Sequence, residues 1–306
     1  MSEPTDLELE GLRRAAFAIA YRMLGSVADA EEVVQEALLR VYRATEEGER
    51  IESPRAYVTT VATRLAIDQL RSARVRRETY TGEWLPEPLL ADPGAGPAQQ
   101  AEIADSLSLA FLVLLESLSP EQRAALLLHD VFGYPYAEIA GIVGKSEDNV
   151  RQLASRARRQ VERDRPRFES SDEQREELAR RFFAAAQEGD LGALESLLAG
   201  DVTLHGDGGG KAPALAFSLQ GRNRVARTLR NWARRGFAAP GAALRRAEVN
   251  GQPGAILLDV EGRVVAVMAL EIAAGRVQAI SSIVNPDKLR HLGPVGNLRT
   301  LLEATE

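Results

Sequence analysis

Cysteine is absent from the 306-residue chain, which excludes disulfides, thiolate metal ligands and a cysteine nucleophile. No apolar run approaches the roughly 20 residues that a transmembrane helix needs. The acidic N-terminal stretch also lacks the apolar core of a signal peptide. These absences predict a cytoplasmic protein that makes no membrane contact.

A net positive charge is also missing. The formal net charge is −6, which argues against a protein that coats nucleic acid non-specifically. The arginines are nevertheless clustered: seven lie between residues 50 and 77 against two acids, and four lie between 151 and 159 with no acid. A specific DNA-binding protein needs only such local basic patches.

The pattern of apolar residues divides the chain. Helical periodicity over 7–78 and 101–165 is interrupted by a Gly- and Pro-rich linker, and β-type runs follow a helix at 172–188. We therefore expect a multidomain fold: two all-helical domains, then an α+β domain. The expected boundaries are 1–78, a linker at 79–104, 105–168, 172–290 and a C-terminal tail at 291–306. The expected strands are 202–205, 243–249, 255–260, 263–272 and 277–284, with a helix near 222–235.

Residues 136–163 carry the strongest local motif. A short helix, a turn at Gly144 and a second helix capped by Ser146 predict a helix-turn-helix, with Val150, Leu153, Ala157 and Val161 buried. The outward residues predicted to contact DNA are Lys145, Ser146, Asn149, Arg151, Gln152, Ser155, Arg156 and Arg159. Residues near the start of such a helix reach base edges, and later arginines reach phosphates. The alternative is an ordinary helical hairpin with a solvated basic face.

Two further helices carry charge. Ser53 and Pro54 begin a basic helix that is expected to run to about Ala73. The candidate contacts to DNA on this helix or directly after it are Arg55, Tyr57, Thr60, Thr63, Arg64, Arg71, Arg74, Arg76 and Arg77. Composition alone leaves DNA binding and a solvated helix equally open. A second helix, expected from 30 to 42 with Asp29 as its cap, has an apolar stripe that ends at Val41 and Tyr42. Its opposite face is acidic, a pattern that by itself is usually only solvation.

These three segments, in this order, resemble the extracytoplasmic-function sigma factors. Residues 29–40 (DAEEVVQEALLR) resemble the helix that docks on the polymerase clamp, 53–71 the helix that melts and reads the minus-ten element, and 137–151 the helix-turn-helix for the minus-thirty-five element. The resemblance implies core RNA polymerase and promoter double-stranded DNA with a melted minus-ten strand as partners. It adds Asp68 to the minus-ten residues, and it assigns polymerase binding to Asp29, Glu31, Glu32, Gln35, Glu36, Leu39 and Arg40.

Three C-terminal and linker motifs resemble the SigJ-like subgroup of these sigma factors. They are Trp84-Leu85-Pro86-Glu87-Pro88, Asp207-Gly208-Gly209-Gly210-Lys211 and Asn285-Pro286-Asp287-Lys288-Leu289. The resemblance implies a fused SnoaL-like domain of the nuclear-transport-factor-two-like fold. It also implies that this domain regulates activity in cis without a separate anti-sigma factor, and that the tail at 291–306 holds activity down.

The chemistry of these motifs suggests an interdomain contact. Glycines permit close approach, and an exposed tryptophan between prolines is costly unless it packs. We therefore expect Trp84 and Pro86 to dock on or near the Gly-rich loop; the alternative is a flexible loop and an unrelated apolar patch. The predicted regulatory residues are Trp84, Leu85, Pro86, Asp207, Gly208, Gly209, Gly210, Lys211, Asn285, Pro286, Asp287 and Lys288.

Two other classes of function compete with a sigma factor. His205 and Asp207 have the chemistry of a general acid and base, but a strand-end histidine and a turn aspartate are commoner, so we expect no enzyme activity and no cofactor. His129 and His291 lack the spacing of metal ligands, and we expect no metal site. A DNA-binding regulator with a small-molecule-sensing domain would need only 105–165 and 172–290, so the N-terminal helices favour the sigma factor.

Overall fold

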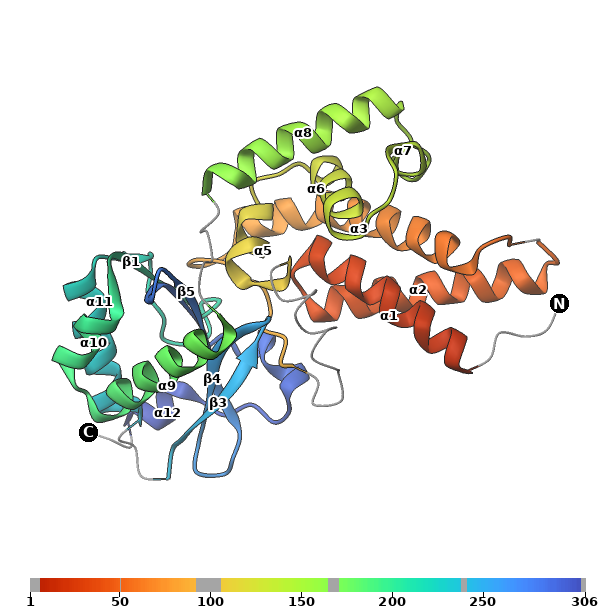
Figure 1. The fold of residues 1–306 in the computed structure, drawn as a ribbon. Helices are drawn as coiled ribbons and strands as arrows, with labels where there is room; N and C mark the ends of the chain where they lie inside the picture. Colours follow the sequence, from red (N-terminus) through yellow and green to blue (C-terminus); the bar gives the residue numbers. More distant parts are fainter. Residues whose placement is uncertain (1–5, 50, 92–105, 165–170, 238–240, 304–306) are drawn as a thin grey trace. The chain divides into compact units, whose positions relative to one another are not determined.

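The computed structural model describes residues 6–49, 51–91, 106–164, 171–237 and 241–303. The chain forms two compact units, one made of residues 1–79 and 112–165 and the other of 80–111 and 166–306. The first unit is helical and the second combines helices with a sheet, as Figure 1 shows, which confirms the expected fold class. The linker expected between the two helical domains thus belongs with the C-terminal unit.

The helices of the first unit follow the sequence pattern closely. They are α1 (Asp6–Leu24), α2 (Val27–Glu46), α3 (Pro54–Glu78), the end of α5 (Leu109–Leu115), α6 (Pro120–Leu126), η1 (Leu127–Val131), α7 (Tyr136–Val143) and α8 (Glu147–Asp164). Helix α2 begins earlier than expected. Ser26, with an extended backbone, accepts a hydrogen bond from the Asp29 N–H at 3.2 Å. Asp29 is therefore a first-turn residue, where its charge favours the helix dipole, and Ser26 is the cap.

The two helical groups of this unit pack against each other. Helices α1, α2 and α3 contact one another, and α3 also contacts α6 and α7. A buried arginine that sequence reasoning missed stabilises the junction: Arg123 donates to the Met23 carbonyl at 2.5 Å and to the Leu115 carbonyl at 2.6 Å. It also pairs with Glu116 at 2.9 Å. Burial lowers the pKa of Arg123 to about 9.

The second unit is a curved mixed sheet with three helices packed on it. Its elements are α9 (Asp172–Glu188), α10 (Leu191–Leu197), β1 (Leu198–Asp207), β2 (Leu219–Gln220), α11 (Arg222–Trp232), η2 (Ala233–Phe237), β3 (Ala243–Val249), β4 (Gln252–Leu258), β5 (Val264–Ala273), β6 (Arg276–Ile283), η3 (Pro286–Lys288), η4 (Arg290–Leu292) and α12 (Leu298–Glu303). The strand order is β2-β1-β6-β5-β4-β3, in which only β1 and β6 pair in parallel. All five expected strands are present; β2 and α10 were not expected.

Apolar side chains from α9, α10 and α11 form one core with the sheet. Phe182 and Phe183 on α9 contact each other edge to face at 5.3 Å. Leu229 on α11 and Ile280 on β6 are fully buried in the same cluster. Across the described ranges, no helix is both long enough and apolar enough to span a membrane.

The cap of α2 provides a test of the helix boundary. We expect Ser26→Ala to lower the free energy of unfolding by about 1 kcal/mol, because it leaves an N–H at the helix start without its acceptor. Chemical denaturation of the full chain measures the loss, and Ser72→Ala on the exposed side of α3 serves as the control. Equal stability of the two variants would contradict Ser26 as the cap.

Candidate nucleic-acid interface and linker clasp

The helix-turn-helix forms as predicted. Gly144 adopts φ 70° and ψ 39°, the left-handed conformation that lets the chain turn between α7 and α8. The Ser146 hydroxyl accepts a weak hydrogen bond from the Asn149 N–H at 3.4 Å. Leu153, expected in the buried stripe, is only half-buried, and Ala154 is fully buried in its place. The stripe follows the i, i+4 spacing from Val150, which places 154 rather than 153 against the core.

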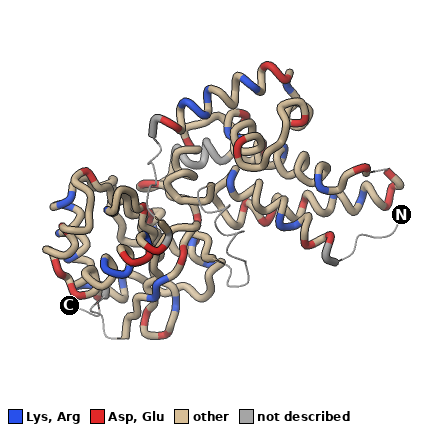
Figure 2. Tube along the Cα trace, in the orientation of Figure 1, with Lys and Arg blue, Asp and Glu red and all other residues tan. Residues whose placement is uncertain are grey.

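The opposite face of α8 is basic and open. The exposed residues there include all but one of the predicted DNA contacts: Lys145, Ser146, Asn149, Arg151, Gln152, Arg156 and Arg159; Ser155 is half-buried. Figure 2 shows blue positions spaced along this helix. Arg151 pairs with Glu147 and lies 4.8 Å from the centre of the Tyr136 ring. Exposed pairs of this kind contribute little stability, so they can be exchanged for phosphate contacts.

Arg158, on the same helix, has a structural role. Its guanidinium donates to both carboxylate oxygens of Asp130, at 3.0 and 2.5 Å. This bidentate pair fixes α8 to η1, and the hydrogen bond to Asp130 raises the pKa of Arg158.

Helix α3 is engaged by the helix-turn-helix part of the first unit. Arg64 donates to the carbonyls of Gly141 and Ile142, both at 2.9 Å. Arg71 pairs with Glu121 on α6 at 2.7 Å. Two arginines predicted to bind the minus-ten element are therefore occupied in this arrangement.

The other predicted minus-ten residues differ in accessibility. Thr63 is fully buried, which contradicts a DNA contact in this arrangement, because it lies on the α3 face that packs into the helical core. Thr60 donates to the Ala56 carbonyl at 2.8 Å. Arg55 and Asp68 are exposed and Tyr57 is half-buried. The side chains of Arg74, Arg76 and Arg77 lie outside the described residues.

The acidic face of α2 has an apolar border. Glu32, Gln35, Leu39 and Arg40 are exposed, and Asp29, Glu31 and Glu36 are half-buried. Glu31 pairs with Arg13 at 2.6 Å, and Glu36 with Arg40 at 2.7 Å. Tyr42, expected in the buried stripe, is 59% exposed. Its i, i+3 spacing from the 40%-exposed Leu39 was the signal that sequence reasoning missed.

In the second unit, one carboxylate organises the linker. Asp207, at the end of β1, is fully buried. Its Oδ2 accepts from Lys288 Nζ at 2.6 Å and from the Leu85 N–H at 2.8 Å. Its Oδ1 accepts from the Tyr80 hydroxyl at 2.5 Å and from the Gly209 N–H at 3.1 Å. A buried carboxylate with this many donors is well compensated for its lost hydration.

Lys288 completes the arrangement. Its ammonium also donates to the Leu85 carbonyl and lies 4.3 Å from the centre of the Trp84 ring and 5.0 Å from that of Tyr80, within range of cation–π attraction. Burial, followed by the hydrogen bond to Asp207, raises the pKa of Tyr80. Its hydroxyl therefore stays protonated as a donor while it accepts from Asn285 Nδ2 at 2.8 Å. We call this set, Tyr80, Trp84, Leu85, Asp207, Asn285 and Lys288, the linker clasp.

The glycine loop permits this close packing. Gly209 has φ 57°, and a Cβ there would collide with the Asn285 side chain. A Cβ on Gly208 would meet the Ala212 carbonyl oxygen. Lys211 and Asp287 form an ion pair at the surface of the clasp, and Pro286 is the first residue of η3, next to Asn285. Leu85 and Pro86 are buried and Trp84 is half-buried.

Asn250 bonds to two positions of the linker region that follows the clasp, Leu89 and Leu107. It has φ 53° in the β3–β4 turn and is buried. Its Oδ1 accepts from the Leu89 N–H at 2.8 Å, and its Nδ2 donates to the Leu107 carbonyl at 2.9 Å. Leu90 forms a bridge with Val249, and the Ala91 N–H bonds to the Glu248 carbonyl, so the linker pairs with the C-terminal end of the edge strand β3. Sequence reasoning missed Asn250; its only signal was the Asn-Gly turn.

The histidines make ordinary contacts. His205 Nδ1 lies 2.7 Å from Glu83 Oε1, and His291 Nε2 lies 2.7 Å from the Pro88 carbonyl oxygen. His129 Nδ1 lies 3.0 Å from the Tyr134 carbonyl oxygen. His205 and Asp207 both bind linker residues. The described residues hold no cluster of His, Asp and Glu suited to a metal ion.

Comparison with known proteins identifies the two units. The models for Sigma-70 region 2 and region 4 match residues 9–76 and 108–161, and the SnoaL-like domain model matches 179–287. The ECF RNA polymerase sigma factor SigJ of Mycobacterium tuberculosis is 42% identical over 290 residues, 92% of each chain. The probable sigma factor SigI of the same species is 34% identical over 279 residues, 89% of this chain and 90% of that one. The SigJ crystal structure matches with a TM-score of 0.75 and 39% identity over 94% of this chain and 98% of that one.

The helical unit and the sheet unit together define a sigma factor with a fused SnoaL-like domain. The chain belongs to the extracytoplasmic-function RNA polymerase sigma factors. Its partners are accordingly RNA polymerase and promoter DNA. Region 2 at the N-terminus is the feature that a simple DNA-binding regulator would not need.

The central pair of the clasp can be tested directly. We expect Asp207→Asn to weaken linker docking by about 3–5 kcal/mol, because it leaves the Lys288 ammonium buried without its counter-charge. Hydrogen exchange should then rise at residues 84–91, and Trp84 fluorescence, read in a Trp232→Phe background, should shift toward that of a solvated indole. The control is Asp201→Asn, on the exposed part of β1; the same response from both variants would contradict the assignment.

Proposed function

We propose that this sigma factor is regulated in cis, with the SnoaL-like unit holding the linker that connects its two promoter-binding regions. The observation that carries the proposal is the clasp. Residues 80–91 follow region 2 in the sequence, yet their hydrogen bonds go to Asp207, Lys288 and Asn250 of the C-terminal unit. The linker is thereby held at a set length by another part of the same chain.

Promoter recognition is assigned to two helices. On α8, Asn149 and Gln152 lie near the helix start, where side chains reach base edges in the major groove. Arg156 and Arg159 lie one and two turns further on, and suit phosphates. On α3, the exposed arginines suit the melted minus-ten strand, and the acidic face of α2, with Leu39 and Tyr42 beside it, suits core polymerase.

The first unit has to open for both elements to be bound at once. The two promoter elements are centred about 25 base pairs apart, which is roughly 85 Å at 3.4 Å per base pair. The 25-residue α3 is only about 38 Å long, and in this unit Arg64 on α3 bonds to the α7 carbonyls while Arg71 pairs with Glu121. We infer that such a closed unit does not cover that distance. Those contacts must break, and so must the hydrogen bond from the buried Arg123 to the Met23 carbonyl. The exposed Arg71–Glu121 pair adds little to the cost of opening.

The clasp limits how far the regions separate after opening. A free chain contributes at most about 3.3–3.6 Å of reach per residue. Residues that are hydrogen-bonded to the SnoaL-like unit contribute none of that freedom. The clasp therefore favours one spacing between the two promoter elements over its neighbours.

Three finer assignments follow from this mechanism. Control from within the chain makes a separate anti-sigma factor unnecessary. The SnoaL-like unit acts by binding the linker and not as an enzyme, since His205 and Asp207 are both committed to linker residues. The site of action is the cytoplasm, where bacterial transcription takes place.

The proposed phosphate contacts predict how promoter affinity depends on salt concentration. We expect Arg156→Ala and Arg159→Ala each to weaken promoter binding at all sequences and to reduce the slope of log K against log salt by about 1. Arg158→Ala is the matched control from the same helix, since its guanidinium pairs with Asp130. A slope that changes equally for Arg158→Ala would contradict the assignment.

The clasp predicts how the protein tolerates promoter spacing. In run-off transcription with core polymerase, we expect the wild type to prefer one spacer length, and Trp84→Ala and Asp207→Ala each to flatten that preference. Because both residues act through one contact, the double variant should do no worse than the more severe single variant. Additive effects, or an unchanged preference in both single variants, would contradict regulation through the clasp.

A further inference from the structure

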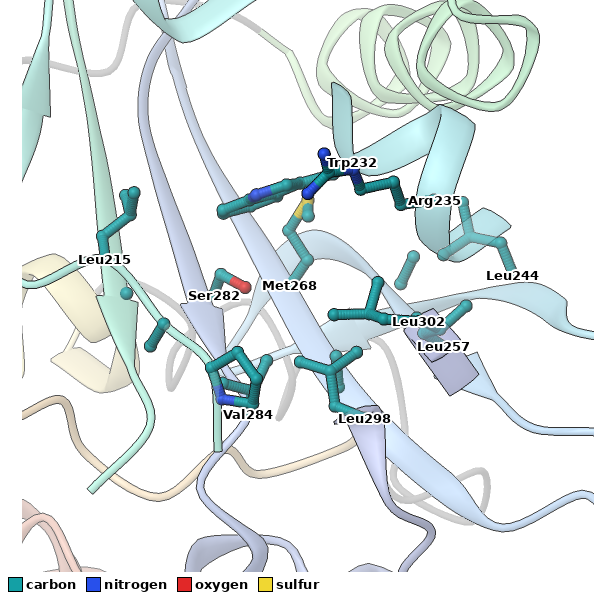
Figure 3. A pocket seen from close by; sticks show the side chains of 15 residues that line it. Leu215, Trp232, Arg235, Leu244, Leu257, Met268, Ser282, Val284, Leu298 and Leu302 are labelled. Carbon is teal, nitrogen blue, oxygen red and sulfur yellow. The ribbon is translucent and has the colours of Figure 1, made fainter. Parts of the chain in front are cut away.

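A second feature of the SnoaL-like unit lies apart from the clasp. An apolar cavity of about 280 Å³ opens between the sheet, η2 and the C-terminal helix α12. Leu215, Met268, Leu257 and Leu298 are among the side chains that line it, and Figure 3 shows them pointing toward one central space. An apolar cavity of about 150 Å³ stays dry and admits benzene, so this one has room for a larger apolar molecule.

The tail supplies one wall of the cavity. Pro294 and Gly296 bond to the backbone of Val264 at 2.9 Å each, which attaches the tail to the start of β5. Asn297 then accepts from the Arg299 N–H at 2.9 Å at the start of α12. Leu301 anchors the helix in a small core with Leu257 and Val265, while Leu298 and Leu302 face the cavity.

The polar groups of the wall are few. Ser282 on β6 is 5% exposed and lines the cavity, and no hydrogen-bond partner for its hydroxyl lies among the described residues. Met268, the cross-strand partner of Ser282 on β5, lies close to Trp232 (Figure 3), and an indole and a thioether suit the face of an aromatic ring. Arg235 on η2 also lines the cavity, but its side chain already has an interaction of its own. The buried Ser282 hydroxyl is therefore the polar group that can orient a small ligand in this mainly apolar wall.

We propose that this cavity binds a neutral, mainly apolar molecule of one or two rings that carries one hydroxyl or carbonyl oxygen. The ring contacts Trp232, Met268 and the tail leucines, and the oxygen bonds to Ser282. A bound molecule touches both the sheet and α12, so it stabilises the docked tail. By linkage, the docked tail raises the affinity for the molecule by the same factor. This inference does not depend on the clasp or on control of transcription.

The test uses 2-naphthol as the probe, with the full chain and calorimetry. We expect saturable micromolar binding, weaker binding of naphthalene, and no gain for 2-naphthoate. Ser282→Ala should weaken 2-naphthol about tenfold and leave naphthalene unchanged, since a site that hydrogen-bonds a ligand oxygen discriminates by at least that much. The matched control is Ser281→Ala, the preceding residue of β6, which is not among the residues that line the cavity.

A second measurement tests whether the ligand and the docked tail stabilise each other. We expect 2-naphthol to slow hydrogen exchange in α12, and Leu298→Ala with Leu302→Ala to weaken its binding by about tenfold. Arg299→Ala and Thr300→Ala, both exposed on the same helix, should leave binding unchanged. Ala266→Leu, which fills the cavity, should abolish binding while circular dichroism stays native.

Three outcomes would overturn the proposal. One is the absence of saturable binding of 2-naphthol up to about 1 mM, an affinity too weak to be specific. Another is tighter binding of 2-naphthoate than of 2-naphthol, which would make the site anionic. The third is faster exchange in α12 on binding, because the molecule would then displace the tail. None of these results bears on the spacer preference in transcription, so the ligand site and the cis control fail independently.

Discussion

The buried ion pair between Asp207 and Lys288 is the interaction on which the C-terminal unit's hold on the linker depends. Taking both charges out of water is costly, and the cost is offset only because Tyr80, Leu85 and Gly209 complete the donors around the carboxylate. The linker therefore supplies part of the solvation of a charge that the domain has already buried. A released linker would leave that pair incompletely bonded, which makes docking strongly favourable and specific.

Asn250 makes a second set of contacts with the linker, and these contacts limit the distance between two linker positions. Its side chain bonds to residue 89 and to residue 107, so these two positions are held at one point on the turn between β3 and β4. The clasp fixes where the linker begins on the domain, and Asn250 fixes where it re-enters the helical regions. Two short-range contacts thus define a constraint between segments that are far apart in the sequence.

The sequence was most informative where local chemistry decides the structure. The turn at Gly144, the cap at Ser146 and the alternation of the five strands were predictable, because each depends on residues within one or two turns. Asp29 was wrongly assigned as the cap of α2, since Ser26 is an equally good cap and position alone did not separate them. Tyr42 and Thr63 were misplaced because burial on a two-faced helix depends on tertiary partners. Asp207 was found through motif resemblance, and Asn250 and Arg123 were missed, because a single polar residue has no periodicity.

The linker clasp and the apolar cavity share two strand ends. On β1, Gly206 lines the cavity and the next residue, Asp207, binds the linker. At the end of β6, Ser282 lines the cavity, as does Val284 just beyond the strand, and Asn285 follows directly and bonds to Tyr80. Successive residues of a strand face opposite sides, so one stretch of backbone carries a residue of the cavity wall next to a residue of the clasp. The sheet thereby places an apolar cavity and a charged linker contact on the two sides of the same strand ends.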